Sequence, residues 1–121
     1  MHFSFVPSRI LAASLVARGC ASAGRAETTI GNWAIHCAKC HAADGSGETP
    51  YGRKMAIRDY RDPTIQTSFT DEELQTCLLR GLNKEGKILM VPFADRLGAD
   101  EIRDLVIYVR GLPAGAQRGK K

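Results

Sequence analysis

Three stretches of the chain alternate apolar and polar residues in patterns typical of helices. The first predicted helix covers residues 28–39. Within it, Trp33 precedes Cys37 by one helical turn, so the two side chains lie on one face. Trp33 is therefore expected beside the short cysteine motif that begins at Cys37.

The second predicted helix begins with a capping box, in which Thr70 is the N-cap and Glu73 follows three residues later. It is expected to stop near Gly81. Its apolar face carries Leu74, Cys77 and Leu78. This spacing predicts that Cys77 is a buried core thiol, and a regulatory or intermolecular disulfide is the alternative.

The last predicted helix covers residues 99–110. Gly98 is a permissive N-cap, and Glu101 occupies the favourable third position. The apolar stripe consists of Ile102, Leu105, Val106 and Val109, with Tyr108 at its edge. Gly111 and Pro113 are expected to end this helix.

The segments between these helices have the composition of loops. Residues 42–53 are rich in glycine, and residues 83–97 contain Gly86 and Pro92. The Gly-x-Gly at positions 45–47 is a weak phosphate signal, because it follows a helix rather than a strand. The sequence shows no convincing strand pattern and no internal repeat. The expected fold is all-α, with three main helices plus loops.

The N-terminal stretch resembles a secretory signal peptide. Arg9 precedes a short apolar run at residues 10–17, and Ala21-Ser22-Ala23 follows. Cleavage is expected after Ala23, or alternatively after Ala26. The run is too short for a comfortable membrane span. An uncleaved anchor and lipidation at Cys20 are the minor alternatives.

We therefore divide the chain into a signal peptide at residues 1–23, one domain at residues 24–115 and a basic tail at residues 116–121. The 121 residues carry a formal net charge of +4. Residues 1–23 contain two arginines and no acidic residue, so their removal lowers the charge to about +2. No long basic run with interleaved aromatic residues is present, and nucleic acid is not an expected partner.

Cys37-Ala38-Lys39-Cys40-His41 is the most informative motif in the chain. Cys-x-x-Cys-His is the attachment signature of a c-type haem. Cys37 and Cys40 can form thioether bonds with the two vinyl groups of one porphyrin, and His41 can then bind the iron. A haem would also supply much of the core of so short a chain.

Zinc binding and dithiol redox chemistry are the other interpretations of this motif. A zinc site usually needs two Cys/His pairs, and outside the motif only Cys77 and His36 remain after the predicted cleavage. A thioredoxin-like Cys-x-x-Cys would need a βαβ pattern around it, and none is visible. Both interpretations are weaker than haem attachment.

Met90 is the favoured second iron ligand. It lies in the loop before the last helix, and Pro92 would stiffen that loop. The alternative role of Met90 is to fill a gap in the core. Met55 is the fallback ligand, whereas His36 is too close to His41 in sequence to reach the opposite face of the same haem.

With these motifs the chain resembles a small class I c-type cytochrome, a bacterial monohaem electron carrier. The resemblance covers about residues 28–112 and rests on the Cys37–His41 motif, the Met90 loop and the last helix with Tyr108. It implies a cytochrome c-like fold around one covalently bound haem c, with Cys37, Cys40, His41 and Met90 as cofactor-binding residues and His41 and Met90 as the iron ligands.

The same resemblance implies that the first and last helices cross near Trp33 and Tyr108. Such proteins often carry Gly-Pro-x-Leu after the haem motif, and residues 52–55 resemble this segment without its proline. The carbonyl of Arg53 is then expected to orient His41, and Met55 to form part of the haem-pocket wall.

Other residues have weaker signals. Arg58, Tyr60 and Arg61 are candidates for contact with a haem propionate, and a solvated face explains them equally well. Three lysines are expected to border the exposed haem edge and to help steer an acidic redox partner, with scattered surface charge as the default; they are Lys39, Lys84 and Lys87.

The expected function is one-electron transfer in the periplasm by a monomer that is not an enzyme, with redox proteins as donor and acceptor. Membrane contact would arise through a redox complex, or through an uncleaved or lipidated N-terminus. Two alternatives stay open: a haem c electron-entry subunit of a larger exported oxidoreductase, and a five-coordinate haem protein that binds a small ligand.

Overall fold

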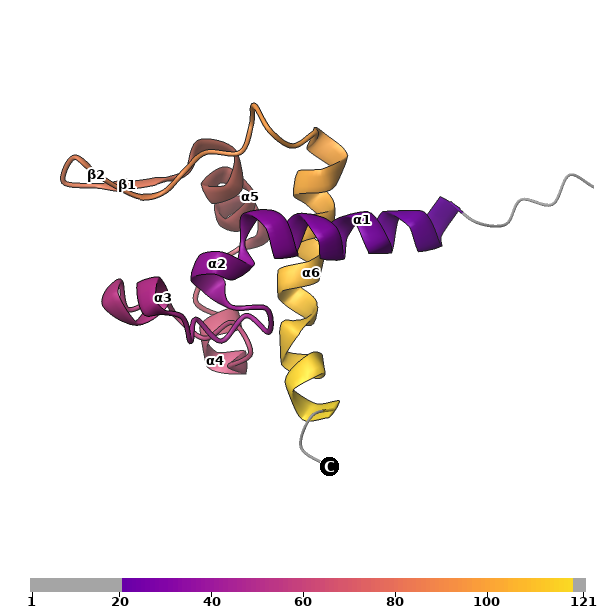
Figure 1. Ribbon diagram of the computed structural model, residues 1–121, viewed down its shortest axis with the longest axis horizontal. Helices are drawn as coiled ribbons and strands as arrows, with labels where there is room; N and C mark the ends of the chain where they lie inside the picture. The colour runs from indigo at the N-terminus through magenta and orange to yellow at the C-terminus, as the bar shows by residue number, and fades with distance from the viewer. Residues whose placement is uncertain (1–20, 119–121) are drawn as a thin grey trace, which may run out of the picture.

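Two long helices that cross each other organise the protein. The computed structural model describes residues 21–118, so Cys20, most of the predicted signal peptide and residues 119–121 lie outside the described residues. Helix α1 lies across helix α6, and the remaining elements are arranged on one side of this crossing (Figure 1). The elements are α1 (Ala21–His36), α2 (Ala38–His41), α3 (Pro50–Lys54), α4 (Pro63–Gln66), α5 (Asp71–Arg80), β1 (Leu82–Lys84), β2 (Lys87–Met90) and α6 (Ala99–Arg118).

The crossing of α1 and α6 holds the centre of the core. The rings of Trp33 and Tyr108 meet there, with their centroids 5.2 Å apart, as the resemblance implied. Ile102 and Leu105 on α6 are almost fully buried. Asn32 on α1 donates a hydrogen bond of 3.1 Å to Glu101 on α6. Apolar packing and a polar contact at its edge together fix the angle between the two helices.

The first helix differs in extent from the prediction of residues 28–39. Helix α1 begins at Ala21 and ends at His36, and a separate turn, α2, follows Cys37. The residues before Thr28 include several alanines, which have the highest helix propensity, so the helix continues toward the N-terminus. Cys37 adopts backbone angles of −118° and −41°, and this change separates the two helices.

Helix α5 confirms the predicted capping box. The Thr70 hydroxyl accepts a hydrogen bond of 3.1 Å from the Glu73 amide, and the Glu73 carboxylate accepts one of 2.8 Å from the Thr70 amide. The helix ends at Gly81, as expected. Leu74 and Leu78 are buried, whereas Cys77 is only half-buried. The prediction that Cys77 is a core thiol is wrong, because its side chain lines a cavity.

Helix α6 runs past the predicted end at Arg110 and contains Pro113. Proline has no amide hydrogen, so the carbonyl of Val109, four residues earlier, loses its helical donor. The side-chain amide of Gln66 replaces this donor, with a hydrogen bond of 2.9 Å to the Val109 carbonyl. A contact from α4 thus supports the helix where the sequence alone predicts its end.

Two of the predicted loops contain regular structure. In the first, Thr49 caps the short helix α3 by accepting a hydrogen bond of 2.8 Å from the Gly52 amide. In the second, β1 and β2 form an antiparallel hairpin that projects from the body (Figure 1). Its turn has positive φ at Glu85 and Gly86, as tight hairpin turns require. The expected all-α class is confirmed, because this hairpin is small.

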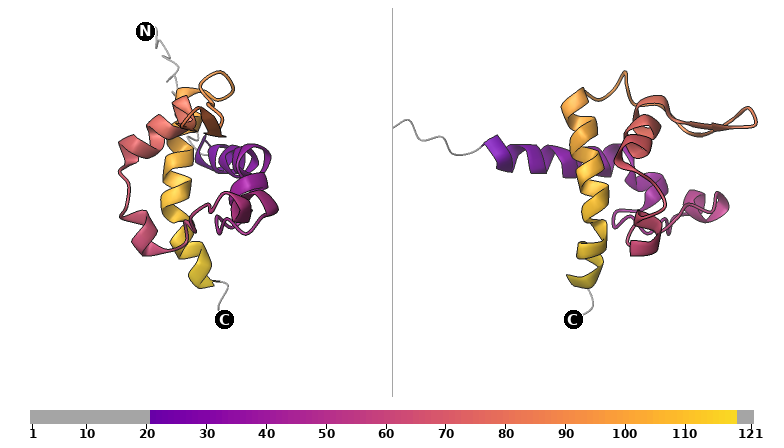
Figure 2. Two further views of the ribbon diagram at one scale, coloured as in Figure 1. Left: turned by 90° about the vertical axis from the view of Figure 1, so that its left-hand side faces the viewer. Right: turned by 180° about the vertical axis from the view of Figure 1, so that it is seen from behind.

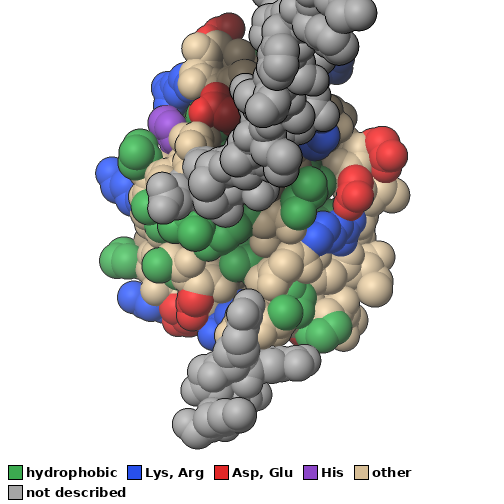
Figure 3. Space-filling model, turned by 90° about the vertical axis from the view of Figure 1, so that its right-hand side faces the viewer, with side chains coloured by type: hydrophobic (Ala, Val, Ile, Leu, Met, Phe, Trp, Pro, Cys, Tyr) green, Lys and Arg blue, Asp and Glu red, His purple; other side chains and the backbone are tan. Residues whose placement is uncertain are grey.

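Some hydrophobic side chains stay exposed near the crossing of α1 and α6. Ile30 and Ile107 are 57% and 64% exposed. With Tyr108 they border a shallow groove of about 280 Å³. Figure 3, seen from the side on which α1 begins, shows hydrophobic side chains gathered among charged ones on this face. Within residues 21–118, no helix has the length and apolar character needed to cross a membrane.

Candidate functional site

The cysteine motif forms the junction between α1 and α2. Cys37 is buried in the core, and Cys40 and His41 follow on the single turn of α2. The His41 amide donates a hydrogen bond of 2.9 Å to the Cys37 carbonyl, which closes this turn. Both thiols are free, and burial together with the neighbouring Cys40 raises the pKa of Cys37 to about 11.

His41 is half-buried, and one of its ring nitrogens, Nδ1, is buried without a hydrogen-bond partner among the described residues. Its ring stacks on Tyr60, with centroids 5.3 Å apart and planes inclined by 18°. Burial lowers the pKa of His41, so the imidazole is neutral at pH 7. The neutral form is the one that binds metals.

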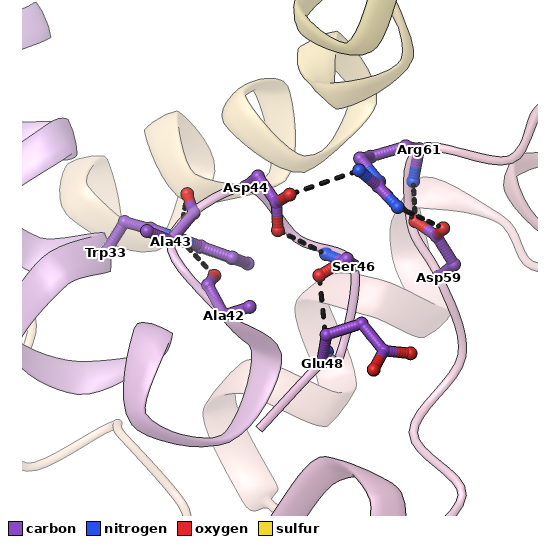
Figure 4. A network of polar contacts seen from close by, with 8 residues as sticks. All are labelled: Trp33, Ala42, Ala43, Asp44, Ser46, Glu48, Asp59 and Arg61. Carbon is purple, nitrogen blue, oxygen red and sulfur yellow. Dashed lines mark hydrogen bonds and ion pairs between the residues drawn. The ribbon is translucent and has the colours of Figure 1, made fainter.

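The loop after the motif is held by a polar network (Figure 4). The indole nitrogen of Trp33 donates hydrogen bonds of 3.1 Å to the carbonyls of Ala42 and Ala43. Farther along, the Asp44 carboxylate accepts a hydrogen bond of 3.0 Å from the Ser46 amide and pairs with Arg61 at 3.1 Å. These contacts fix the chain that leaves His41 and leave its imidazole free to face the cavity.

A cavity of about 450 Å³ lies next to His41, within the range of small-molecule and cofactor sites. Its walls come from α2, the segment between α3 and α4, the segment before α5, α5 itself and the hairpin. Figure 2 shows these elements around one side of the molecule. Most lining side chains are apolar, and Cys37 and Cys40 are not among them. The lining residues are His41, Met55, Ala56, Ile57, Arg58, Tyr60, Ser68, Phe69, Glu73, Leu74, Cys77, Leu82, Leu89 and Met90.

Met90 reaches the same cavity from the end of β2. It is half-buried and packs against the core. Its strand is held by the Tyr51 hydroxyl, which donates a hydrogen bond of 3.1 Å to the Leu89 carbonyl. On the other side, the Cys77 sulfur lies 3.7 Å from the Met90 sulfur. The structure therefore brings His41 and Met90 to one cavity from distant parts of the chain.

The segment after the motif differs in part from the expectation. Met55 lines the cavity, as the resemblance implied. The Arg53 carbonyl accepts hydrogen bonds from the amides of Met55 and Ala56, not from His41. The reason is local, because these two bonds close the C-terminal end of the short helix α3. The expected orientation of His41 by Arg53 is therefore wrong in this structure.

Only two of the three residues predicted to contact a haem propionate lie at the cavity. Arg58 and Tyr60 line the cavity, whereas Arg61 does not. Arg61 instead pairs with Asp59 at 2.8 Å and with Asp44. Arg58 donates a hydrogen bond of 2.9 Å to Ser68. Burial raises the pKa of Tyr60, so its hydroxyl is protonated at neutral pH.

Three lysines were expected at a haem edge, and all three are exposed: Lys39, Lys84 and Lys87. In the register of the hairpin, Lys84 lies opposite Lys87. Sequence reasoning missed Tyr51 and Phe69 as residues of the site. Tyr51 lay in an expected loop, and only its position beside Pro50 marked the start of a short helix.

The cavity and the motif fit a covalently attached haem. A neutral imidazole and a thioether line one largely apolar cavity, and these are ligand types that haem proteins use. Two free thiols with the attachment spacing, those of Cys37 and Cys40, precede His41 in the chain. The described residues contain no group of three or more His, Cys, Asp or Glu side chains arranged to hold a metal ion.

Comparisons with known proteins agree with this fit. The family model described as "Cytochrome c" matches residues 32–113. The solved structure of the KustC0563 c-type cytochrome superposes with a TM-score of 0.60 at 28% identity, covering 69% of this chain and 95% of that one. A tyrosine-to-phenylalanine variant of that cytochrome gives a TM-score of 0.59 at 28% identity, covering 69% and 96%. No curated protein sequence matches the chain.

Proposed function

This chain belongs to the cytochrome c family, and we propose that it is a periplasmic one-electron carrier whose haem iron is bound by His41 and Met90. Members of this family carry a covalently bound haem c with iron, exchange electrons with redox partners and are usually exported. The observation that carries the proposal is the placement of His41 and Met90 on the wall of one cavity.

The chain's own residues have distinct roles in this proposal. Cys37 and Cys40 would hold the haem through thioether bonds and so keep the cofactor beside His41. His41 and Met90, which line one cavity, would supply the protein ligands of the haem iron. The bound haem supplies the exchange of one electron between ferrous and ferric iron.

The protein's further contribution is to exclude water and to keep the ligands in place. Leu74, Phe69 and Leu89 give the cavity apolar walls, which favour the iron state of lower charge. The neutral thioether of Met90 acts in the same direction and raises the potential. Trp33 holds the backbone that leaves His41, so little reorganisation is needed when an electron arrives or departs.

The carrier role follows from filled coordination positions. With His41 and Met90 both on iron, no position is open for a substrate, and the protein is proposed not to be an enzyme. The predicted signal peptide at residues 1–23 supports the periplasm as its location. Arg58, beside the cavity, is the proposed contact for a haem propionate.

Carbon monoxide binding to the reduced haem protein tests this function. With Met90 on iron, the reduced protein resists carbon monoxide at neutral pH, because the gas must displace a protein ligand. The Met90→Ala variant binds it rapidly and serves as the positive control. Rapid binding by the unaltered protein contradicts the carrier proposal and favours a five-coordinate ligand-binding protein.

A further inference from the structure

We propose that the Cys77 thiol donates a hydrogen bond to the Met90 sulfur and thereby tunes this residue as an iron ligand. The inference rests on the proposed binding of iron by His41 and Met90. It assigns Cys77 a positioning and electronic role that its helical spacing did not predict.

The first support is the contact itself. The two sulfur atoms are 3.7 Å apart, and both side chains line the cavity. A thioether carries no hydrogen, so the thiol of Cys77 must be the donor. An ordinary thiol is protonated at neutral pH. A thioether sulfur has two lone pairs, and one can bind iron while the other accepts this hydrogen bond.

The second support is the backbone around the contact, which leaves little freedom to the two side chains. The Phe93 amide donates a hydrogen bond of 2.9 Å to the Leu78 carbonyl, so the chain after Met90 is tied to α5. Gly81, which ends α5, has φ of +72°, and its Cα lies so near the Met90 carbonyl that a Cβ there would overlap it. Helix α5 and the chain around Met90 thus lie close together at the two positions that follow Cys77 toward the end of the helix, Leu78 and Gly81.

The third support is the position of Cys77 within α5. Its neighbours on the same face, Leu74 and Leu78, are buried, whereas Cys77 is half-buried and lines the cavity. A larger apolar residue at this position could fill the same space but could not donate a hydrogen bond. The polar hydrogen is therefore the property that distinguishes cysteine here.

A hydrogen bond to the ligand sulfur draws electron density away from its lone pairs. Oxidised iron depends more on electron donation from its ligands than reduced iron does, so the contact disfavours the oxidised state. The expected consequence is a higher reduction potential than the same ligand pair would give without the thiol.

Three variants separate this role from packing. Cys77→Val keeps the approximate shape and removes the donor, and Cys77→Ser keeps a donor. Leu79→Val is the matched control, because Leu79 is a half-buried residue of the same helix that does not line the cavity, and the change leaves the Cys77–Met90 contact in place. We expect a lower potential in Cys77→Val, a potential close to or above that of the unaltered protein in Cys77→Ser, and an unchanged potential in Leu79→Val.

A cycle with Met90→Ala tests whether the effect passes through the methionine. Cys77→Val should shift the potential in the protein with Met90 and leave it unchanged in Met90→Ala. Equal shifts in both backgrounds, or an unchanged potential in Cys77→Val, overturn the inference. If Met90→Ala keeps the methionine-to-iron absorption band, the proposed iron ligation fails instead, so the two failures are distinguishable.

The S–H stretching band of the haem protein gives a readout that does not depend on electron transfer. Loss of this band in Cys77→Ser assigns it to Cys77. The band should lie at a lower frequency in the unaltered protein than in Met90→Ala, because a hydrogen bond weakens the S–H bond. The same frequency in both proteins contradicts the proposed donor.

Discussion

Trp33 donates a hydrogen bond from its indole nitrogen to the carbonyl oxygen of Ala42, 3.1 Å away, and so ties helix α1 to the residue that directly follows His41. The same nitrogen shares a second bond with the Ala43 carbonyl. Trp33 also packs on Tyr108 at the crossing of α1 and α6. One side chain therefore connects the helix crossing with the backbone of the proposed iron ligand.

We expect Trp33→Phe to destabilise the haem protein by roughly 1–3 kcal/mol, because it leaves the carbonyls of Ala42 and Ala43 without this donor and reduces packing in the core. Denaturant unfolding, followed by far-UV circular dichroism, measures the loss. Ile35→Ala on the same helix is the control, since Ile35 is 74% exposed. An equal loss in both variants would contradict the role given to the indole.

The support of α6 by Gln66 gives a second prediction. In Gln66→Ala, the Val109 carbonyl loses the donor that replaces the missing amide of Pro113, and stability should fall by about 1–3 kcal/mol. Pro113→Ala restores a helical amide opposite this carbonyl. The cost of Gln66→Ala should therefore be smaller in the Pro113→Ala background. Thermal unfolding of the unaltered protein, the two single variants and the double variant measures this coupling. Strictly additive effects on stability would contradict this explanation.

Gly81 is predicted to be essential for the position of Met90. Its φ is +72°, and a Cβ would overlap the Met90 carbonyl and the Pro92 nitrogen. We expect Gly81→Ala to displace the Met90 strand and to weaken the methionine-to-iron absorption band of the oxidised protein. Gly86→Ala is a matched control, because Gly86 has φ of +78° and open space around it. That variant should cost about 1–2 kcal/mol through backbone strain alone and should keep the band.

Acid should lower the stability of the folded protein by weakening the contacts that hold the loop after the haem motif. The hydrogen bonds from Ser46 lower the pKa of Asp44, and the hydrogen bond from Arg61 lowers the pKa of Asp59. A carboxyl group with a lowered pKa stabilises the folded state above its ordinary pKa of about 3.9, and this contribution disappears as the pH falls through the lowered value. Urea unfolding between pH 5 and pH 2 should show the loss.

The double variant Asp44→Asn, Asp59→Asn should be less stable than the unaltered protein at pH 5 and should depend less on pH below 4. The effect is expected to be modest, since both carboxyl groups are largely solvated. A pH dependence identical to that of the unaltered protein would contradict the assignment of the acid sensitivity to this loop.

Much of the site could be predicted from local sequence, because its signals depend on neighbours only a few residues apart. The spacing of Cys37, Cys40 and His41 is one such signal, and the capping box of Thr70 and Glu73 is another. The start of α6 at Gly98 and Glu101 also follows local rules, with a hydrogen bond of 2.8 Å between the Gly98 amide and the Glu101 carboxylate.

The parts that could not be predicted depend on contacts between distant residues. Helix α6 continues past Pro113 because Gln66, from another helix, donates a hydrogen bond to the Val109 carbonyl. The hairpin was missed because β1 is wholly exposed and β2 is exposed at its start, so no alternation marks them. Cys77 has the same helical spacing as two buried leucines. Its side chain nevertheless lines the cavity, where Met90 from the hairpin contacts it.

The most direct test of the proposed ligation is the absorption spectrum of the oxidised haem protein, in the unaltered chain and in two methionine variants. We predict the weak methionine-to-iron band in the unaltered protein and in Met55→Leu, because Met55 only lines the cavity. The band should be absent from Met90→Ala, with a lower reduction potential. A band that persists in Met90→Ala, or that disappears in Met55→Leu alone, would contradict iron binding by Met90.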